Sequence, residues 1–241
     1  MAWFVQGGQP STGWPSESCR LWHAVLVEGE YHAVVTGEMG NKMQVHPVMV
    51  GSQRVELPLV PLSDSVAVAL MMTIDQGVSF AEQAGRELAD HFRGHQVEII
   101  AAPATLGIPV AVEVTRALDL DDYVILQKTR KTHLHNALSV ELTSVTTKAA
   151  QRLLLDRRRV DVVRGRRVVL VDDVISSGGS INAAADLLTQ AGAQLVGIGT
   201  LLTEGHRWRE CLGSRADLVH ALGTIPLFKR QEDSWVPSDG Q

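Results

Sequence analysis

After about residue 75, apolar strand-like runs alternate with helical patterns, and this alternation constrains the fold more than any other feature of the chain. Strands that are apolar along their whole length need cover on both faces, which is typical of parallel sheets in α/β domains. The strands are predicted at residues 97–102, 123–127, 168–171 and 195–202, and the helices at residues 80–92, 108–118, 146–155 and 181–191. We therefore predict a parallel twisted sheet flanked by helices, with ligands bound at the carboxyl ends of its strands.

The first third of the chain has a shorter, β-like rhythm. Residues 21–27 and 31–35 are two such runs, separated by a plausible hairpin turn, and residues 54–60 and 66–71 continue the pattern. We therefore expect a β-rich N-terminal, hood-like region beside the α/β sheet. The predicted division is an N-terminal extension at residues 1–50, an α/β domain at residues 51–230 and a C-terminal tail at residues 231–241.

The composition narrows the classes of function. Hydrophobic residues make up 45% of the chain, and the net charge of −5 gives no global reason to expect nucleic-acid binding. Cys19 and Cys211 stand alone, without the spacing of a disulfide framework or a zinc site. No apolar run approaches the ~18 residues of a membrane span, and the first residues lack the pattern of a signal peptide. We therefore expect a cytoplasmic protein with no membrane partner.

The most informative segment follows the predicted strand at residues 168–171. Three serines there offer hydroxyl donors, and two glycines allow the backbone to approach a ligand closely. The start of the next helix adds free N–H groups and the positive end of its dipole. These features together predict a phosphate-binding loop made of Ser176, Ser177, Gly178, Gly179 and Ser180.

Two carboxylates, Asp172 and Asp173, precede this loop. They would repel a phosphate, but they suit sugar hydroxyls or the ligand shell of Mg²⁺. A helix N-cap alone would not need two acids, three serines and two glycines in one place. The whole segment therefore favours a ligand with a phosphate at one end and hydroxyls with a metal ion at the other, such as a phosphorylated ribose.

Residues 168–180 resemble the motif with which the type I phosphoribosyltransferases bind 5-phosphoribosyl-1-pyrophosphate (PRPP). That motif has four apolar residues, two acids, two mostly apolar residues and a small, hydroxyl-rich and glycine-rich loop. The resemblance runs from about residue 55 to 228 and is closest to the adenine phosphoribosyltransferase-like branch. It implies that Asp172 and Asp173 bind the ribose hydroxyls and Mg²⁺ and take part in catalysis. It also implies that PRPP is contacted by Val174, Ile175, Ser176, Ser177, Gly178, Gly179 and Ser180.

Two upstream segments are similar to other parts of the family's site. The loop that holds pyrophosphate in the family corresponds to Thr105, Leu106 and Gly107, where the adenine enzymes usually carry Glu-Ala-Arg-Gly. This chain lacks that acid and that arginine, so backbone donors would have to serve. Residues 124–131 resemble the family's strand followed by a basic segment, which makes Lys128 the candidate pyrophosphate ligand and Arg130 its neighbour.

Residues 132–145 resemble the family's loop that closes over the active site and excludes water. The adenine enzymes place a glutamate near the attacking base nitrogen in this region. The corresponding position here falls around Thr143, and Glu141 lies two residues earlier. Glu141 is therefore the candidate catalytic acid or base.

The resemblance implies a Mg²⁺-dependent enzyme, a homodimer by analogy, that transfers the phosphoribosyl group from PRPP to a purine. Adenine is the first candidate, and the products would be a nucleoside monophosphate and pyrophosphate. A non-catalytic, PRPP-sensing regulator that binds nucleic acid is the alternative, favoured by the missing Glu-Ala-Arg-Gly and by an arginine cluster. That cluster is better explained as a solvated surface, given the negative net charge, so a nucleic-acid partner is not expected. The arginine cluster consists of Arg152, Arg157, Arg158, Arg159, Arg164, Arg166 and Arg167.

A salvage enzyme for a non-purine acceptor is a third alternative.

Overall fold

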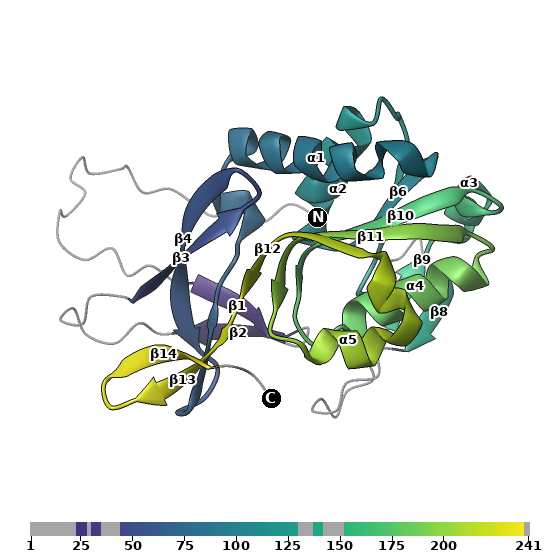
Figure 1. Ribbon diagram of the computed structural model, residues 1–241. Coiled ribbons are helices and arrows are strands. Elements are labelled where there is room, and N and C mark those ends of the chain that lie inside the picture. Colours follow the sequence, from purple (N-terminus) through teal and green to yellow (C-terminus); the bar gives the residue numbers. More distant parts are fainter. Residues whose placement is uncertain (1–22, 28–29, 35–43, 130–136, 142–151, 239–241) are drawn as a thin grey trace, which may run out of the picture. The chain divides into compact units, whose positions relative to one another are not determined.

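The structure, a computed structural model, describes residues 23–27, 30–34, 44–129, 137–141 and 152–238 (Figure 1). By its internal contacts the chain divides into two units, Met1–Asn41 and Lys42–Gln241. In the first unit, strand β1 (His23–Val27) pairs antiparallel with β2 (Glu30–Val34). This pairing confirms the two β-like runs that the sequence predicted there.

The centre of the second unit is a five-stranded sheet in which every described pairing is parallel. Its strand order is β12-β11-β10-β6-β7. The strands are β6 (Ile99–Pro103), β7 (Tyr123–Leu126), β10 (Arg167–Ile175), β11 (Gln194–Glu204) and β12 (Val219–Ile225). The long helices are α1 (Val78–Phe92), α2 (Gly107–Ala117) and α4 (Gly179–Gln190). The predicted parallel sheet flanked by helices is confirmed.

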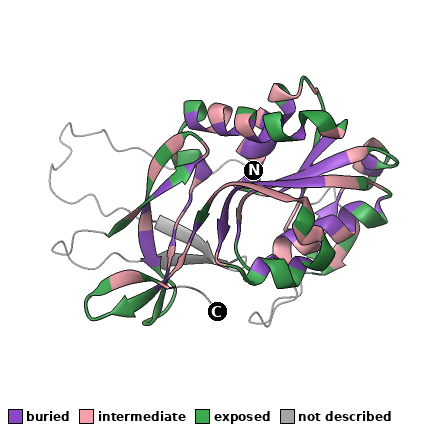
Figure 2. Cartoon of the chain, in the orientation of Figure 1, coloured by how far each residue is buried: buried purple, intermediate pink, exposed green. Residues whose placement is uncertain are grey.

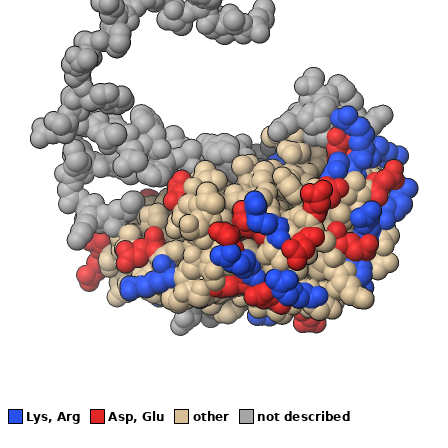
Figure 3. Space-filling view, turned by 90° about the horizontal axis from the view of Figure 1, so that it is seen from above, with Lys and Arg blue, Asp and Glu red and all other residues tan. Residues whose placement is uncertain are grey.

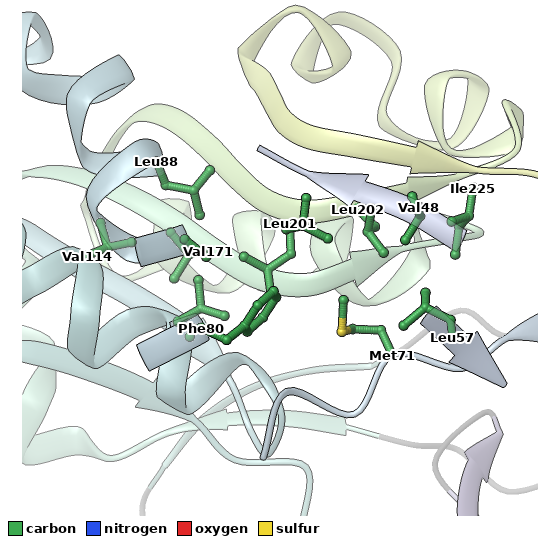
Figure 4. Packing of buried hydrophobic residues seen from close by; sticks show 14 of the residues in the cluster. Val48, Leu57, Met71, Phe80, Leu88, Val114, Val171, Leu201, Leu202 and Ile225 are labelled. Atoms are coloured by element: carbon green, nitrogen blue, oxygen red, sulfur yellow. The ribbon is translucent and has the colours of Figure 1, made fainter. Parts of the chain in front are cut away.

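Two hydrophobic clusters cover the two faces of this sheet, and β10 contributes to both. Val169 and Val171 belong to the cluster that contains residues of α1 and α2, whereas Val168 and Leu170 belong to the cluster that contains residues of α4. Successive side chains of a strand point to opposite faces, so a strand covered on both sides has to be apolar throughout. Figure 2 shows the central strands as buried, and Figure 4 shows Val171 in the first cluster with Leu88 of α1 and Val114 of α2.

A second sheet of five strands is antiparallel, with the order β14-β13-β5-β4-β3. It joins the two ends of the second unit, because β13 from near the end of the chain pairs with β5 from near its start. Its strands β4 and β5 correspond to the runs predicted at residues 54–60 and 66–71, whereas β13 and β14 come from the C-terminal part, where no strands were predicted. Its strands are β3 (Val45–Val50), β4 (Gln53–Pro61), β5 (Val66–Ala69), β13 (Leu227–Gln231) and β14 (Ser234–Ser238).

The predicted boundaries at residues 50 and 230 remain predictions as statements about domains. The pairings nevertheless cross both of them, because β3 pairs with β4 and β14 pairs with β13. The first hydrophobic cluster also extends from the helices to Val48 of β3 and Leu57 of β4, as Figure 4 shows. Residues 45–50 and 231–238 are thus parts of the second sheet and pack with its core.

The helix predicted over residues 146–155 is wrong where the structure describes it. Residues 152–155 form strand β9 (Arg152–Leu155), which pairs antiparallel with β8 (Leu138–Glu141), and residues 146–151 lie outside the described part. Leu153 and Leu155 are buried in the second cluster, and the backbone of Leu154 exchanges two hydrogen bonds with Gln127. A strand partner and burial therefore outweigh the high helix propensity of leucine.

Short helical segments complete the second unit. They are η1 (Thr73–Asp75), η2 (Arg93–His95), η3 (Arg157–Arg159), α3 (Val160–Val163), α5 (Arg207–Leu212) and η4 (Gly213–Leu218). Helix α4 ends just before Gly192, which has φ +86°, as expected for a glycine that follows a helix. Within the described ranges, none of the helices is long and apolar enough to cross a membrane.

Candidate functional site

Asp172 and Asp173 belong to strand β10 itself. The sequence predicted that the strand ends at residue 171, but β10 continues to Ile175 because it stays paired with β11, with Asp172 opposite Thr200 and Ile175 opposite Thr203. On its other side, the pairing of β10 with β6 ends at Leu170. Beyond that residue one edge of β10 is free of β6, and the two acids lie at this point of the sheet.

Burial makes both acids difficult to ionise. Asp172 is only 7% exposed and Asp173 is half-buried. Burial, followed by the charge of Asp173, raises the pKa of Asp172 well above its usual range, and burial also raises the pKa of Asp173. The Asp173 N–H donates to Asp172 Oδ1 at 3.0 Å, which fixes the first carboxyl group against the backbone. Two adjacent carboxyls, one buried and one half-buried, are expected to bind a cation or hydroxyl donors readily.

The loop at residues 104–107 lies directly against Asp172. A Cβ atom on Gly107 would stand 2.8 Å from Asp172 Oδ1 and 3.4 Å from Asp172 Cα, so only glycine fits here without displacement. The loop is held by two further hydrogen bonds, from Ala104 N–H to Leu126 O at 2.8 Å and from Thr73 Oγ1 to Leu106 O at 2.9 Å. The start of α2 is therefore placed beside the acids. Ile108 N–H donates to Thr105 O and Pro109 has no N–H, so among these first three residues of the helix Gly107 N–H is the donor that remains for a ligand.

Lys128 lies at the same edge of the sheet. It follows β7 and the backbone bridge between Gln127 and Leu154, and it is half-buried. The charge of Lys128 opposes the rise in the pKa of both Asp172 and Asp173, so its ammonium group is electrostatically coupled to the acids. Arg130, its predicted neighbour, lies outside the described residues.

The serine-glycine loop turns into α4 in the place that the sequence predicted. Gly178 has φ +84°, and a Cβ atom on it would stand 3.1 Å from the backbone of Trp208 and from Cys211 Cβ, so the loop packs closely on α5. Ser176 and Ser177 are exposed and Ser180 is half-buried. The side chain of Ile175 is buried in the second hydrophobic cluster.

Glu141 has a different setting from the other predicted site residues. It lies at the end of β8, its side chain is 66% exposed, and its carboxylate pairs with Arg152 Nη2 at 2.8 Å. Within residues 44–129, 137–141 and 152–238, no recorded hydrogen bond or ion pair joins Glu141 to the two acids of β10. Its catalytic role stays a prediction, and Thr143 lies outside the described residues.

Two polar residues of this region were missed by the sequence analysis. Thr73 is buried and holds the loop at residues 104–107 through Leu106. Glu204, at the end of β11, is 6% exposed and accepts a hydrogen bond from Ser176 Oγ. Glu204 could have been found by the rule that identified Asp172, since it is an acid at the carboxyl end of an apolar strand. Nothing local distinguishes Thr73.

Comparison with known proteins agrees with this geometry. Residues 74–214 match the family model described as the phosphoribosyl transferase domain, and this match spans more than half of the chain. The chain belongs to the phosphoribosyl transferase domain family. The acids of β10, the loop before α2 and the loop before α4 all lie within the matched residues.

The relatives that resemble the chain include enzymes named for different bases and a transcriptional repressor. Orotate phosphoribosyltransferase of Caldanaerobacter subterraneus subsp. tengcongensis is 29% identical over 129 residues, which cover 54% of this chain and 56% of that protein. Xanthine phosphoribosyltransferase 1 of Clostridium perfringens is 28% identical over 161 residues, covering 66% and 82%. The purine biosynthesis transcriptional repressor PurR of Bacillus subtilis is 28% identical over 124 residues, covering 52% and 42%.

A solved structure of adenine phosphoribosyltransferase from Thermoanaerobacter pseudethanolicus has the same fold. It aligns with a TM-score of 0.57 and 22% identity, over 70% of this chain and 95% of that one. This likeness shows the phosphoribosyltransferase fold that the sequence resembles. The family therefore includes both enzymes and a repressor among the relatives of this chain.

The two acids at the end of β10 have the donor atoms that a Mg²⁺ ion would require. In the described part of the chain, no group of three or more His, Cys, Asp or Glu side chains is arranged to hold a metal ion. Asp172 and Asp173 supply two carboxylates, and Mg²⁺ is commonly held by one or two carboxylates together with water and substrate phosphates. The acid pair thus fits a shared metal site and does not form a complete protein cage.

Proposed function

We propose that the protein transfers the phosphoribosyl group of PRPP to a purine base, giving a nucleoside monophosphate and pyrophosphate. The observation that carries this proposal is the meeting of an acid pair with two helix starts and a lysine at one edge of the parallel sheet. A phosphate group at each end of a sugar needs two anion-binding places separated by groups that bind hydroxyls, and this edge offers that order.

Each predicted residue has a role in this proposal. Asp172 and Asp173 bind the ribose hydroxyls and Mg²⁺, and the segment 174–180 binds the 5-phosphate. Thr105, Leu106 and Gly107 bind the pyrophosphate through the start of α2, with Lys128 and Arg130 as cationic partners. Bound Mg²⁺ would neutralise charge on the leaving pyrophosphate. Glu141 remains the proposed acid or base near the acceptor nitrogen.

The acceptor base is proposed to be a purine, with adenine as the first candidate. The likeness to xanthine phosphoribosyltransferase supports the purine class, whereas the likeness to orotate phosphoribosyltransferase keeps a pyrimidine acceptor as a competing candidate. A homodimer in the cytoplasm is part of the same proposal. Light scattering after size-exclusion chromatography should give a mass of two chains, and a mass of one chain would refute the dimer.

The decisive experiment measures pyrophosphate release from PRPP and Mg²⁺ with one base at a time. Adenine, hypoxanthine, guanine, xanthine, uracil and orotate form the panel. We expect release with one purine, and loss of release when Asp172→Ala is combined with Asp173→Ala. Asp161→Ala, an exposed acid on α3, is the matched control and should retain activity. Release with orotate alone would refute the purine assignment.

A regulator that senses PRPP and binds nucleic acid is the second candidate, favoured by the likeness to PurR. Ion pairs reduce the free charge of the arginine cluster, because four members pair with acids: Arg152 with Glu141, Arg158 with Asp156, Arg159 with Asp122 and Arg164 with Asp161. Positive and negative side chains are mixed over the middle of the face drawn in Figure 3, whereas positive ones gather at its right-hand end. PRPP binding without pyrophosphate release from any base, together with PRPP-dependent DNA binding, would favour the regulator.

A further inference from the structure

Among the described residues, the buried carboxyl of Glu204 accepts its side-chain hydrogen bond from the hydroxyl of Ser176. Glu204 ends strand β11 and is 6% exposed, and the hydrogen bond from Ser176 Oγ measures 2.5 Å. In the described part of the chain, the ion pairs between basic and acidic side chains do not include Glu204. A buried carboxyl without a cation is costly, and burial raises the pKa of Glu204. An apolar side chain at this position would carry a smaller free-energy cost of burial. The carboxyl is therefore expected to have a structural or functional role.

The position of Ser176 supplies that reason. Ser176 is the first residue after β10 and the first residue of the loop that leads into α4. The pairing of Ile175 with Thr203 in the two parallel strands brings Ser176 beside Glu204. The hydrogen bond therefore fixes the point at which the chain leaves the sheet and enters the loop.

The segment that follows Glu204 holds the same loop at a second point. Gly178 packs against Trp208 and Cys211 of α5, and Trp208 Nε1 donates to Gly205 O at 3.2 Å. Residues 204–211 therefore form a bracket that contacts the loop through Glu204 at its start and through α5 at its middle. We call this segment the loop bracket.

We propose that Glu204 is a positioning residue for the 5-phosphate, because its carboxyl acts as the acceptor that holds Ser176 and so keeps the loop ready to bind. The inference rests on the proposed binding of PRPP at this loop. The Ser176 hydroxyl donates a hydrogen bond to Glu204, so Ser176 contributes to phosphate binding through its backbone N–H. The hydroxyl donors to phosphate are then those of Ser177 and Ser180.

Two substitutions should therefore act as one. Ser176→Ala removes the donor, Glu204→Ala removes the acceptor, and the double variant should be no worse than either alone. Glu204→Gln keeps an acceptor oxygen and should restore binding, which a loss of negative charge alone would not do. Glu210→Ala is the matched control for Glu204→Ala. Glu210 is an exposed glutamate on α5, in the same loop bracket.

Calorimetry should compare two probes that fill different parts of the site, ribose 5-phosphate and pyrophosphate with Mg²⁺. We expect Ser176→Ala and Glu204→Ala each to raise the Kd for ribose 5-phosphate about tenfold, as for one lost hydrogen bond to a carboxylate. The Kd for pyrophosphate should change by less than about twofold, since pyrophosphate is proposed to bind at the loop of residues 105–107. Glu204→Gln and Glu210→Ala should stay within about threefold of the native Kd for ribose 5-phosphate.

Several results would overturn the inference. Equal weakening of both probes would show a general structural role, and a Glu204→Gln variant as weak as Glu204→Ala would show that charge is what matters. If Glu204→Ala fails to fold, Ser176→Ala still decides, because Ser176 is exposed and its loss leaves no cavity. If the native protein binds neither probe, the proposed function falls together with the inference. If it binds both and Ser176→Ala is unchanged, the inference alone falls.

Discussion

Gly107→Ala tests directly whether the start of α2 and the acid pair form one site. The new Cβ atom would stand 2.8 Å from Asp172 Oδ1 and 3.4 Å from Ala102 Cβ. Asp172 Oδ1 already accepts the Asp173 N–H at 3.0 Å, so the carboxyl cannot turn away without losing that hydrogen bond. The methyl group must therefore displace either the acid or the first turn of α2.

The effect on stability should be small compared with the effect on binding. Overpacking of this kind costs about 1–3 kcal/mol, and alanine returns about 0.4–1 kcal/mol by restricting the unfolded chain. The net loss of about 0–2.6 kcal/mol corresponds to a Tm lower by about 0–10 °C for a chain of this size. Displacement of a site group by about 1 Å can lower the reaction rate up to ~100-fold. We therefore expect the KM for PRPP to rise at least about tenfold.

Thermal unfolding and the PRPP dependence of pyrophosphate release measure the two effects separately. Gly94→Ala is the matched control, because nothing lies within 4 Å of its new Cβ atom and its φ lies outside the positive range. It should match the native protein in both measurements. A Gly107→Ala protein with the Tm and KM of the Gly94→Ala control would refute the placement of α2 against the acids.

Three further substitutions follow from the structure. In calorimetry, Lys128→Ala should raise the Kd for pyrophosphate with Mg²⁺ by about tenfold and change the Kd for ribose 5-phosphate little. An equal rise in both Kd values would contradict Lys128 as a pyrophosphate ligand. Gly197→Ala would place a Cβ atom 2.5 Å from the Phe92 ring, so its Tm should fall by about 2–10 °C, and a native Tm would argue against this packing. Burial raises the pKa of Glu204 in the folded state, so the unfolded chain ionises first and native stability falls as pH rises from the usual carboxyl pKa to the raised one. Glu204→Gln removes this dependence, so its Tm relative to the native Tm should increase between pH 4 and pH 8 in thermal melts, and a constant difference would refute the argument.

The pattern of consecutive residues predicted those features that do not depend on a distant partner in the chain. The strand around Leu170 and the helix that ends at Phe92 were found because burial on two faces, or on one stripe, is written into consecutive residues. The acids and the serine-glycine loop were found for the same reason, since they are contiguous. Their chemistry could be inferred before any contact was known.

Other features depended on partners that are distant in the chain. Residues 152–155 are a strand because β8 and Gln127 pair with them, although three successive leucines favour a helix in isolation. β10 continues to Ile175, past the apolar run at residues 168–171, because β11 continues beside it. The second sheet needs β13 and β5, which are separated by most of the chain, to meet.

By itself the sequence determined the parallel α/β class, the acid pair, the loop before α4 and the family to which they point. Only the tertiary structure decided that Gly107 lies against Asp172, that the charge of Lys128 acts on the two acids, that Glu141 pairs with Arg152, and that Glu204 holds Ser176. The physical reason is that a motif within one loop depends on neighbouring residues, whereas these contacts depend on which strand ends the sheet brings together. Strand order is set by burial summed over the whole domain, and no single segment carries it.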